Sequence, residues 1–218
     1  MTKFSNDIDL LKWEPVLFRD LAPPSQILCE GNDGVLSGTT FTSTGAAFTG
    51  QGVTAGQVIY LSDVGQSLDG CYEVVSVNSA TQLTVSVLRS PDNDITIAPP
   101  AGSGLSYRIC TYDPQAEEVA YSLLQYFNLS AVDENNVLEN TVLNERSLRQ
   151  ASVYAILSAV FAGNACGKKD VNGYWEKSLR YQKLFHRVRS RVKLDIDTNG
   201  DELPENYGCG GVIRLRRL

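Results

Sequence analysis

The chain has a single histidine and lacks the motifs on which common catalytic and metal sites depend. His186 has no second histidine with which to hold zinc, and none of the five cysteines forms a Cys-x-x-Cys pair. Neither a Gly-x-Ser-x-Gly motif nor a phosphate-binding loop occurs. We therefore expect no enzyme and no cofactor, and the odd number of cysteines favours reduced thiols in a cytosol.

Long apolar runs are also missing. The N-terminus has no cationic stretch followed by an apolar segment, so we expect no signal peptide. The longest apolar-rich run, residues 151–165, is interrupted by Ser158 and is shorter than the roughly 20 residues that span a bilayer. We therefore expect no membrane partner.

Basic residues are scarce in most of the chain and concentrated near its end. Residues 1–165 contain seven Lys and Arg against eighteen Asp and Glu, whereas residues 166–218 contain twelve against seven. Such asymmetry suits a nucleic-acid partner, or a protein whose basic end meets the acidic part of a neighbour. The overall net charge of −6 argues against general affinity for nucleic acid.

The first half of the sequence predicts an arm followed by a β-rich module. Prolines 15, 23 and 24 interrupt residues 1–25, which favours an extended N-terminal arm with at most a short helix. Residues 26–112 are rich in Thr, Val, Ser and Gly. Alternation on both sides of the turn Asn-Ser-Ala-Thr predicts a hairpin over residues 70–88, and further strands are expected at 56–61 and 105–112. We expect a small β-barrel or β-sandwich.

Residues 113–207 read as a helical domain. Asp113 and Pro114 give a strong start signal for a first helix that ends by residue 128. Apolar residues at helical spacing predict a second, central helix over 145–163 and a third over 173–193. The predicted fold class is therefore α+β, with a three-helix bundle core and the small β module.

The third predicted helix carries a basic face that includes Arg180, Lys183, Arg187 and Arg191. Three interpretations stay open: a solvated face, an interface with another subunit, and a surface that grips nucleic-acid phosphates. Of these, we assign the four residues to contacts between subunits.

The segment Asp-Ile-Asp-Thr-Asn-Gly-Asp-Glu-Leu-Pro-Glu, residues 195–205, opens like a calcium loop. The bidentate Glu of a full EF-hand is absent, because position twelve is Asn206. We predict a polar turn that ends the third helix and no assigned metal site. Weak candidate ligands are Asp195, Asp197, Asn199 and Asp201.

The C-terminal segment, residues 208–218, begins with glycines and ends in a basic, apolar strip. Apolar residues at a chain end normally fray, unless another chain or the protein's own sheet covers them. We predict a docking tail that binds a partner through Val212, Ile213, Arg214, Leu215, Arg216, Arg217 and Leu218.

These parts together resemble a known family. The segment DPQAEEVAYSLLQYF, the apolar second helix, and an aromatic-rich third helix running into an Asp-x-Asp-x-Asn-Gly turn lie within residues 113–205. In this arrangement the chain resembles the head–tail adaptor (connector) proteins of tailed bacteriophages. The resemblance is architectural, and the β module would be an insertion.

The resemblance implies a structural virion protein of the neck region, made in the host cytoplasm. It would form a ring of twelve copies that joins the portal of the capsid to the tail. The C-terminal tail would bind the portal protein, the β module would face the next neck or tail protein, and DNA would pass through the ring without specific contacts. Alternatives are another tail or baseplate adaptor or terminator protein, and a nucleic-acid-binding protein that uses residues 173–193.

Overall fold

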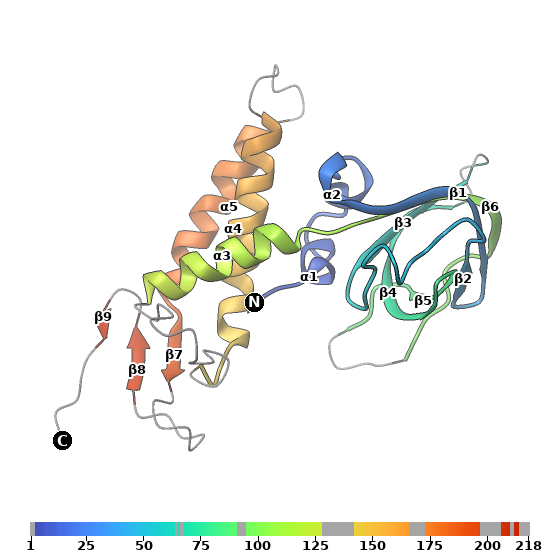
Figure 1. Ribbon diagram of the computed structural model, residues 1–218. Helices are drawn as coiled ribbons and strands as arrows, with labels where there is room; N and C mark the ends of the chain where they lie inside the picture. The colour runs from blue at the N-terminus through green and yellow to red at the C-terminus, as the bar shows by residue number, and fades with distance from the viewer. Residues whose placement is uncertain are drawn as a thin grey trace. The chain divides into compact units, whose positions relative to one another are not determined.

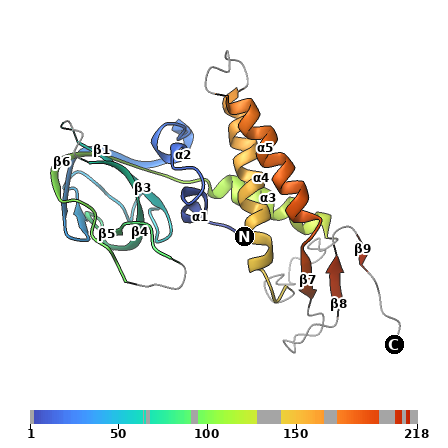
Figure 2. The same ribbon diagram turned by 180° about the vertical axis from the view of Figure 1, so that it is seen from behind.

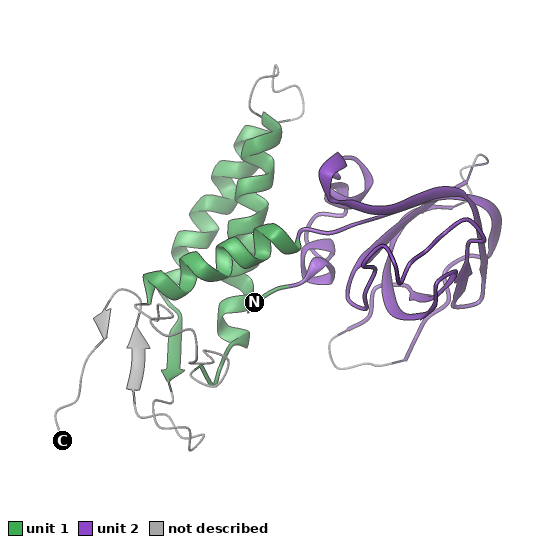
Figure 3. Ribbon diagram, viewed as in Figure 1, with its two compact units in different colours: residues 1–5, 113–218 green, residues 6–112 purple. Residues whose placement is uncertain are grey.

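The computed structural model describes residues 3–63, 65, 68–90, 95–127, 142–165 and 173–196, and the backbone of residues 206–209 and 212–213. The chain divides into two compact units, which Figure 3 colours separately. Unit 2 is continuous, residues 6–112, whereas unit 1 combines residues 1–5 with residues 113–218. Unit 2 is therefore inserted into the sequence of unit 1.

Unit 2 is built on a closed antiparallel barrel with the strand order β1-β2-β5-β4-β3-β6 (Figure 1). The pairing of β1 with β6 closes the barrel, so both sides of every strand have a neighbour. The strands are β1 (Ile27–Ser37), β2 (Thr40–Thr42), β3 (Val58–Ser62), β4 (Asp69–Ser79), β5 (Gln82–Ser86) and β6 (Gly102–Cys110).

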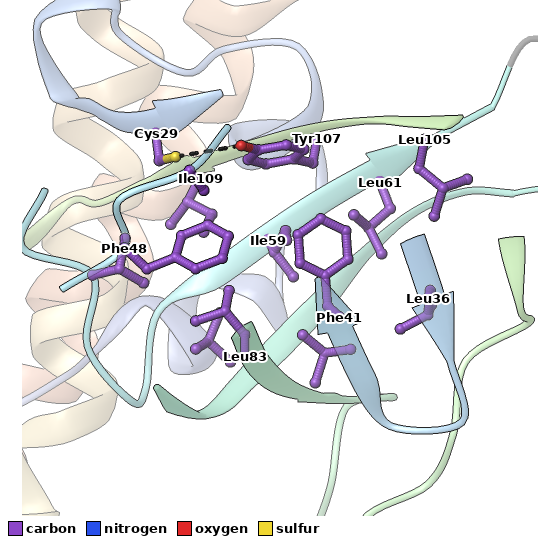
Figure 4. Packing of buried hydrophobic residues seen from close by; sticks show 14 of the residues in the cluster. Cys29, Leu36, Phe41, Phe48, Ile59, Leu61, Leu83, Leu105, Tyr107 and Ile109 are labelled. Carbon is purple, nitrogen blue, oxygen red and sulfur yellow. Dashed lines mark hydrogen bonds between the residues drawn. The ribbon is translucent and has the colours of Figure 1, made fainter. Parts of the chain in front are cut away.

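Alternating side chains of these strands fill the barrel (Figure 4). Phe41 is fully buried, and its ring meets the ring of Tyr107 edge-on at 5.1 Å between centroids. The buried cluster comprises Cys29, Leu36, Phe41, Ala46, Phe48, Val53, Ile59, Leu61, Leu68, Val74, Leu83, Val85, Leu105, Tyr107 and Ile109.

The expected extended arm at residues 1–25 is instead a pair of short helices, α1 (Asp7–Leu11) and α2 (Val16–Arg19), followed by the 3-10 turn η1 (Pro24–Gln26). Asn6 caps α1 through a reciprocal capping box with Asp9. Leu10, Leu17 and Phe18 are buried. The prolines therefore separate short helical turns and do not keep the segment extended. Folding back buries the leucine and phenylalanine side chains, and this burial is favourable in free energy.

Unit 1 contains the helices α3 (Asp113–Tyr126), α4 (Arg146–Ala165) and α5 (Tyr174–Arg189). Helices α4 and α5 run side by side in both views (Figures 1 and 2). The Phe161 ring of α4 stacks on the Tyr181 ring of α5 at 5.9 Å, and Ser158 and Ser178 donate hydrogen bonds to each other's carbonyl oxygens. Among the described residues, no helix is long and apolar enough to cross a membrane.

A small antiparallel sheet completes unit 1, in the order β7-β8-β9. Its strands are β7 (Lys193–Ile196), β8 (Asn206–Cys209) and β9 (Val212–Ile213). Side chains of β7 join the helical core, which also receives Phe4 from the N-terminal segment. The core members are Phe4, Ala120, Leu123, Phe127, Val142, Leu148, Ala151, Val192, Leu194 and Ile196.

The predicted fold class is wrong, because it assigned the core to a three-helix bundle. The sequence predicted a three-helix bundle core, but the structure contains a closed six-stranded barrel, and no helical bundle core is evident. In unit 1 the apolar stripes of the helices are shared with β7 and with Phe4, so the three helices do not pack only on one another. Their apolar spacing revealed buried faces without revealing what covers them.

Candidate functional site

The predicted basic face of α5 lies on the exposed side of that helix. Arg180, Lys183 and Arg187 follow at spacings of three and four residues, and Arg191 continues the stripe just beyond the helix end. All four side chains are exposed, and none forms an ion pair with another described residue. We call these four residues the basic stripe.

Exposed apolar side chains border the basic stripe. Trp175 is 50% exposed and Leu179 is 37% exposed, and both lie on the i, i+4 row that leads to Lys183. By contrast, Arg189 leaves the stripe, because its guanidinium lies 3.9 Å from the ring centroid of Tyr126 and near Phe185. The mixture of unpaired cations with an exposed tryptophan is typical of protein interfaces, in which Arg and Trp are enriched.

His186, the one histidine, also lies on α5. Its side chain is exposed, and its Nδ1 is 3.3 Å from Nη2 of Arg189. Because the guanidinium can only donate, this Nδ1 accepts the hydrogen bond. No group of three or more His, Cys, Asp or Glu side chains in the described part of the chain could hold a metal ion.

The structure describes only part of the residues predicted at the C-terminus. Val212 and Ile213 form β9 and pair with Cys209 and Gly208 of β8, so the first two residues of the predicted tail are already paired within their own subunit. Residues 214–218 lie outside the described residues. Of the weak metal candidates, Asp195 lies in β7, and Asp197, Asn199 and Asp201 lie outside the described residues.

Sequence reasoning missed a pocket on the outer surface of the barrel. It has a volume of about 460 Å³ and is lined by Glu30, Gly31, Asn32, Tyr60, Ser106, Tyr107 and Arg108. These residues belong to β1, β3 and β6, which are adjacent in the barrel. We call it the outer pocket.

Strand register places the polar side chains of the outer pocket side by side. Arg108 of β6 lies opposite Glu30 of β1 on one side and opposite Tyr60 of β3 on the other. An irregularity in β1 between Gly31 and Gly34 inserts one extra residue relative to β6. At this bulge Asn32 faces β6 and accepts a 2.8 Å hydrogen bond from the Ser106 hydroxyl.

Further contacts of Arg108 and Tyr60 fix the side chains of the outer pocket. Arg108 donates from Nη2 to the carbonyl oxygens of Phe18 and Arg19 at the end of α2. Its Cζ lies 5.6 Å from the ring centroid of Tyr60, whose hydroxyl donates to Asp69 at 3.0 Å. Glu30, although opposite Arg108, forms no hydrogen bond or ion pair with a described side chain.

The same bulge directs Asp33 toward the segment after β2. Its carboxylate accepts hydrogen bonds from the Ser43 hydroxyl at 2.7 Å, from the Gly45 amide at 2.9 Å and from the Thr44 hydroxyl at 3.0 Å. The bond from Ser43, followed by that from Gly45, lowers the pKa of Asp33 to about 2.

The network continues into the barrel. The Ser43 oxygen lies 2.9 Å from the Tyr107 hydroxyl, which in turn lies 3.7 Å from the Cys29 sulfur (Figure 4). Since Ser43 donates its proton to Asp33, Tyr107 donates to Ser43. Burial raises the pKa of Tyr107 to about 12 and also raises the pKa of Cys29, so both groups keep their protons at neutral pH. This network therefore has a structural role: it connects β1, the segment after β2 and β6 by hydrogen bonds.

In comparisons with known proteins, no family model matches the chain, and no curated protein and no solved structure is significantly similar to it.

Proposed function

We propose that the chain is a structural virion protein, a head–tail adaptor that joins the portal to the tail as a ring of identical copies. The observation that carries this proposal is the basic stripe of α5, which is exposed, unpaired among the described residues and bordered by Trp175 and Leu179. The resemblance of residues 113–205 to connector proteins supplies the identity of the assembly.

The charge of the two units favours contact between different surfaces of neighbouring copies. Unit 2 contains four basic and eleven acidic residues, a formal charge of −7, whereas unit 1 has a formal charge of +1. A basic stripe on one copy that meets acidic surface on the next is a heterologous contact, and such contacts close into rings when the rotation permits. Long-range attraction would also speed the encounter between copies.

The C-terminal end supplies the second contact of the proposed adaptor. Strand β9 pairs with β8 on one side only among the strands that the structure describes. Residues 214–218 continue from this strand with three arginines and two leucines. In the proposed assembly they extend beyond β9 to the portal protein, and the barrel faces the next neck or tail protein.

The ring is tested with the portal protein from the same genome. We expect negative-stain images of the mixture to show rings beneath the portal, and the double variant Arg180→Glu, Arg187→Glu to abolish them. Arg146→Glu is the matched control, because Arg146 is an exposed arginine of α4 outside the basic stripe. Rings that form equally well with both variants would refute the role of the stripe.

Deletion of residues 214–218 tests the tail separately, because it leaves β9 in place. We expect this truncation to lose portal binding and to keep the unfolding temperature of the full chain. The nucleic-acid alternative predicts a different result. The unchanged chain would bind duplex DNA with an affinity that falls steeply as salt rises, and the stripe variants would lose that affinity. Observing that affinity in the absence of portal binding would replace the adaptor proposal.

A further inference from the structure

The proposed ring and portal contact assign no role to the outer pocket, yet its lining is rich in hydrogen-bonding groups. Its outward-facing residues are Glu30, Asn32, Tyr60, Ser106 and Arg108. Gly31 and Tyr107 lie between them on the strands, with side-chain positions that face the barrel interior. The volume of about 460 Å³ falls within the range of roughly 300–1,000 Å³ that small-molecule sites have.

The lining excludes several classes of ligand. No aliphatic side chain lines the pocket, which argues against a lipid or another apolar molecule. Glu30 is the one carboxylate among the lining residues, and a single carboxylate does not make a cation site. The same carboxylate disfavours a phosphate, and the two Arg108 bonds to α2 already use part of its guanidinium.

What the lining offers is a dense mixture of hydrogen-bond donors and acceptors next to one aromatic ring. Asn32 uses its Oδ1 to accept from Ser106 and so presents its amide NH₂ as a donor. The Glu30 carboxylate is an acceptor without a described partner. Tyr60 adds an aromatic ring that Arg108 holds in place. A ligand that matches this set has many hydroxyl groups, no net charge and an apolar C–H face that packs on an aromatic ring.

The pocket is also rigid before a ligand arrives. Its side chains come from three neighbouring strands of a closed barrel, and Arg108, Asn32 and Tyr60 each have a hydrogen-bonded partner. A preformed site loses little side-chain freedom on binding, which favours even a small ligand. The bulge at Gly31–Gly34 aims Asn32 at this place, and β-bulges commonly re-aim side chains beside functional sites.

We propose that the outer pocket binds a neutral saccharide of one or two rings. Glu30 and Asn32 hydrogen-bond to sugar hydroxyls, and the Tyr60 ring packs against the C–H face of the sugar. This activity would add carbohydrate recognition to unit 2. The proposal does not depend on whether the chain forms a ring with a portal.

The full chain is tested first on an array of neutral glycans and then by isothermal titration with maltose, cellobiose, lactose and chitobiose. We expect at least one of them to bind with a dissociation constant between about 10 μM and 5 mM. Glu30→Gln and Asn32→Ala should each weaken that binding at least tenfold. Glu118→Gln is the matched control, since it removes an exposed carboxylate from α3, outside the pocket, and should leave the affinity unchanged.

Amide chemical shifts locate the bound sugar. We expect shifts at residues 30–32, 60 and 106–108 on titration, and Tyr60→Phe, which keeps the ring, should retain binding better than Tyr60→Leu. Failure of every glycan on the array, or equal effects of Glu30→Gln and Glu118→Gln, would overturn the proposal. If Glu30→Gln instead changes the sedimentation of the chain and no sugar binds, the pocket is a contact between copies and the saccharide is refuted.

Discussion

In unit 2 six strands close on themselves, whereas in unit 1 the strands β7, β8 and β9 form an open sheet beside three helices. A closed barrel has no strand edge at which a partner can add a strand, so recognition by unit 2 requires side chains on its surface. Unit 1 offers a strand edge at β9 and an exposed basic helix. The two units are therefore suited to different kinds of partner.

The units also differ in the polar contacts that join their elements. Unit 2 contains a partly buried ion pair, Arg89 with Glu73, and the hydrogen-bond chain from Asp33 through Ser43 to Tyr107. In unit 1, paired serines join neighbouring elements, with Ser158 to Ser178 and Ser5 to Ser152. Charged groups thus take part in these contacts of unit 2, whereas neutral hydroxyls join the elements of the helical unit.

The largest effect should come from removing the central ring of the barrel. Phe41→Ala deletes a fully buried side chain that contacts Phe48 and Tyr107, and we expect it to destabilise unit 2 by about 3–5 kcal/mol. In urea unfolding followed by circular dichroism, the transition of the barrel should move and that of the helices should not. A parallel shift of both transitions would show that the units unfold as one.

The partly buried ion pair of unit 2 should have the next largest effect. Arg89→Ala leaves the Glu73 carboxylate, whose side chain is 8% exposed, without its guanidinium partner. We expect a loss on the order of 2–3 kcal/mol in the barrel transition, which is between the values for exposed and fully buried pairs. The double variant Arg89→Leu, Glu73→Leu should recover part of that stability, and failure to recover would indicate that the pair is not the cause.

A smaller effect is expected between the helices of unit 1. Ser178→Ala removes one of the reciprocal hydrogen bonds with Ser158 and should cost about 1 kcal/mol in the helical transition alone. Combining it with Ser158→Ala should cost less than the sum of the single changes, because the two hydroxyls share their partners. Additive losses in the double-mutant cycle would argue against the pairing.

The smallest expected effect concerns how the stability of unit 2 depends on pH through Asp33. Asp33 has a pKa of about 2 in the folded chain, below its ordinary value of 3.8, so its carboxylate stabilises the folded state above pH 4. That contribution should disappear as pH falls from 4 to 2. Melting temperatures of the chain and of Asp33→Asn should therefore converge over this window, and curves that stay parallel would contradict the assignment.

Much of the local structure could be predicted, because regular elements leave a period in the sequence. The hairpin of β4 and β5 and the three helices follow from alternating and helical spacing. Strand β1 was not predicted, since Gly31, Asn32 and Gly34 resemble a turn, whereas they form a bulge inside an eleven-residue strand. Barrel closure was equally hidden, because it depends on β1 pairing with β6, about 75 residues later in the chain.

The two candidate sites also differ in whether a local sequence pattern reveals them. Three residues of the basic stripe lie on α5 and the fourth lies just beyond its end, so spacing along the sequence alone identified the stripe. The outer pocket joins Glu30 and Asn32 of β1 to Tyr60 of β3 and Arg108 of β6, and no local pattern links these residues. Only the register of three strands brings them together.

The insertion of one unit within the other sets an order for folding during synthesis. Phe4 packs in the core of unit 1, Ser5 hydrogen-bonds to Ser152, and Lys3 lies 2.7 Å from Asp113. These first residues leave the ribosome more than a hundred residues before their partners do, whereas the barrel of residues 6–112 has all its strands available sooner. The barrel can thus fold before the N-terminal segment finds its partners. Packing of Phe4 into the core of unit 1 is then a late step in folding.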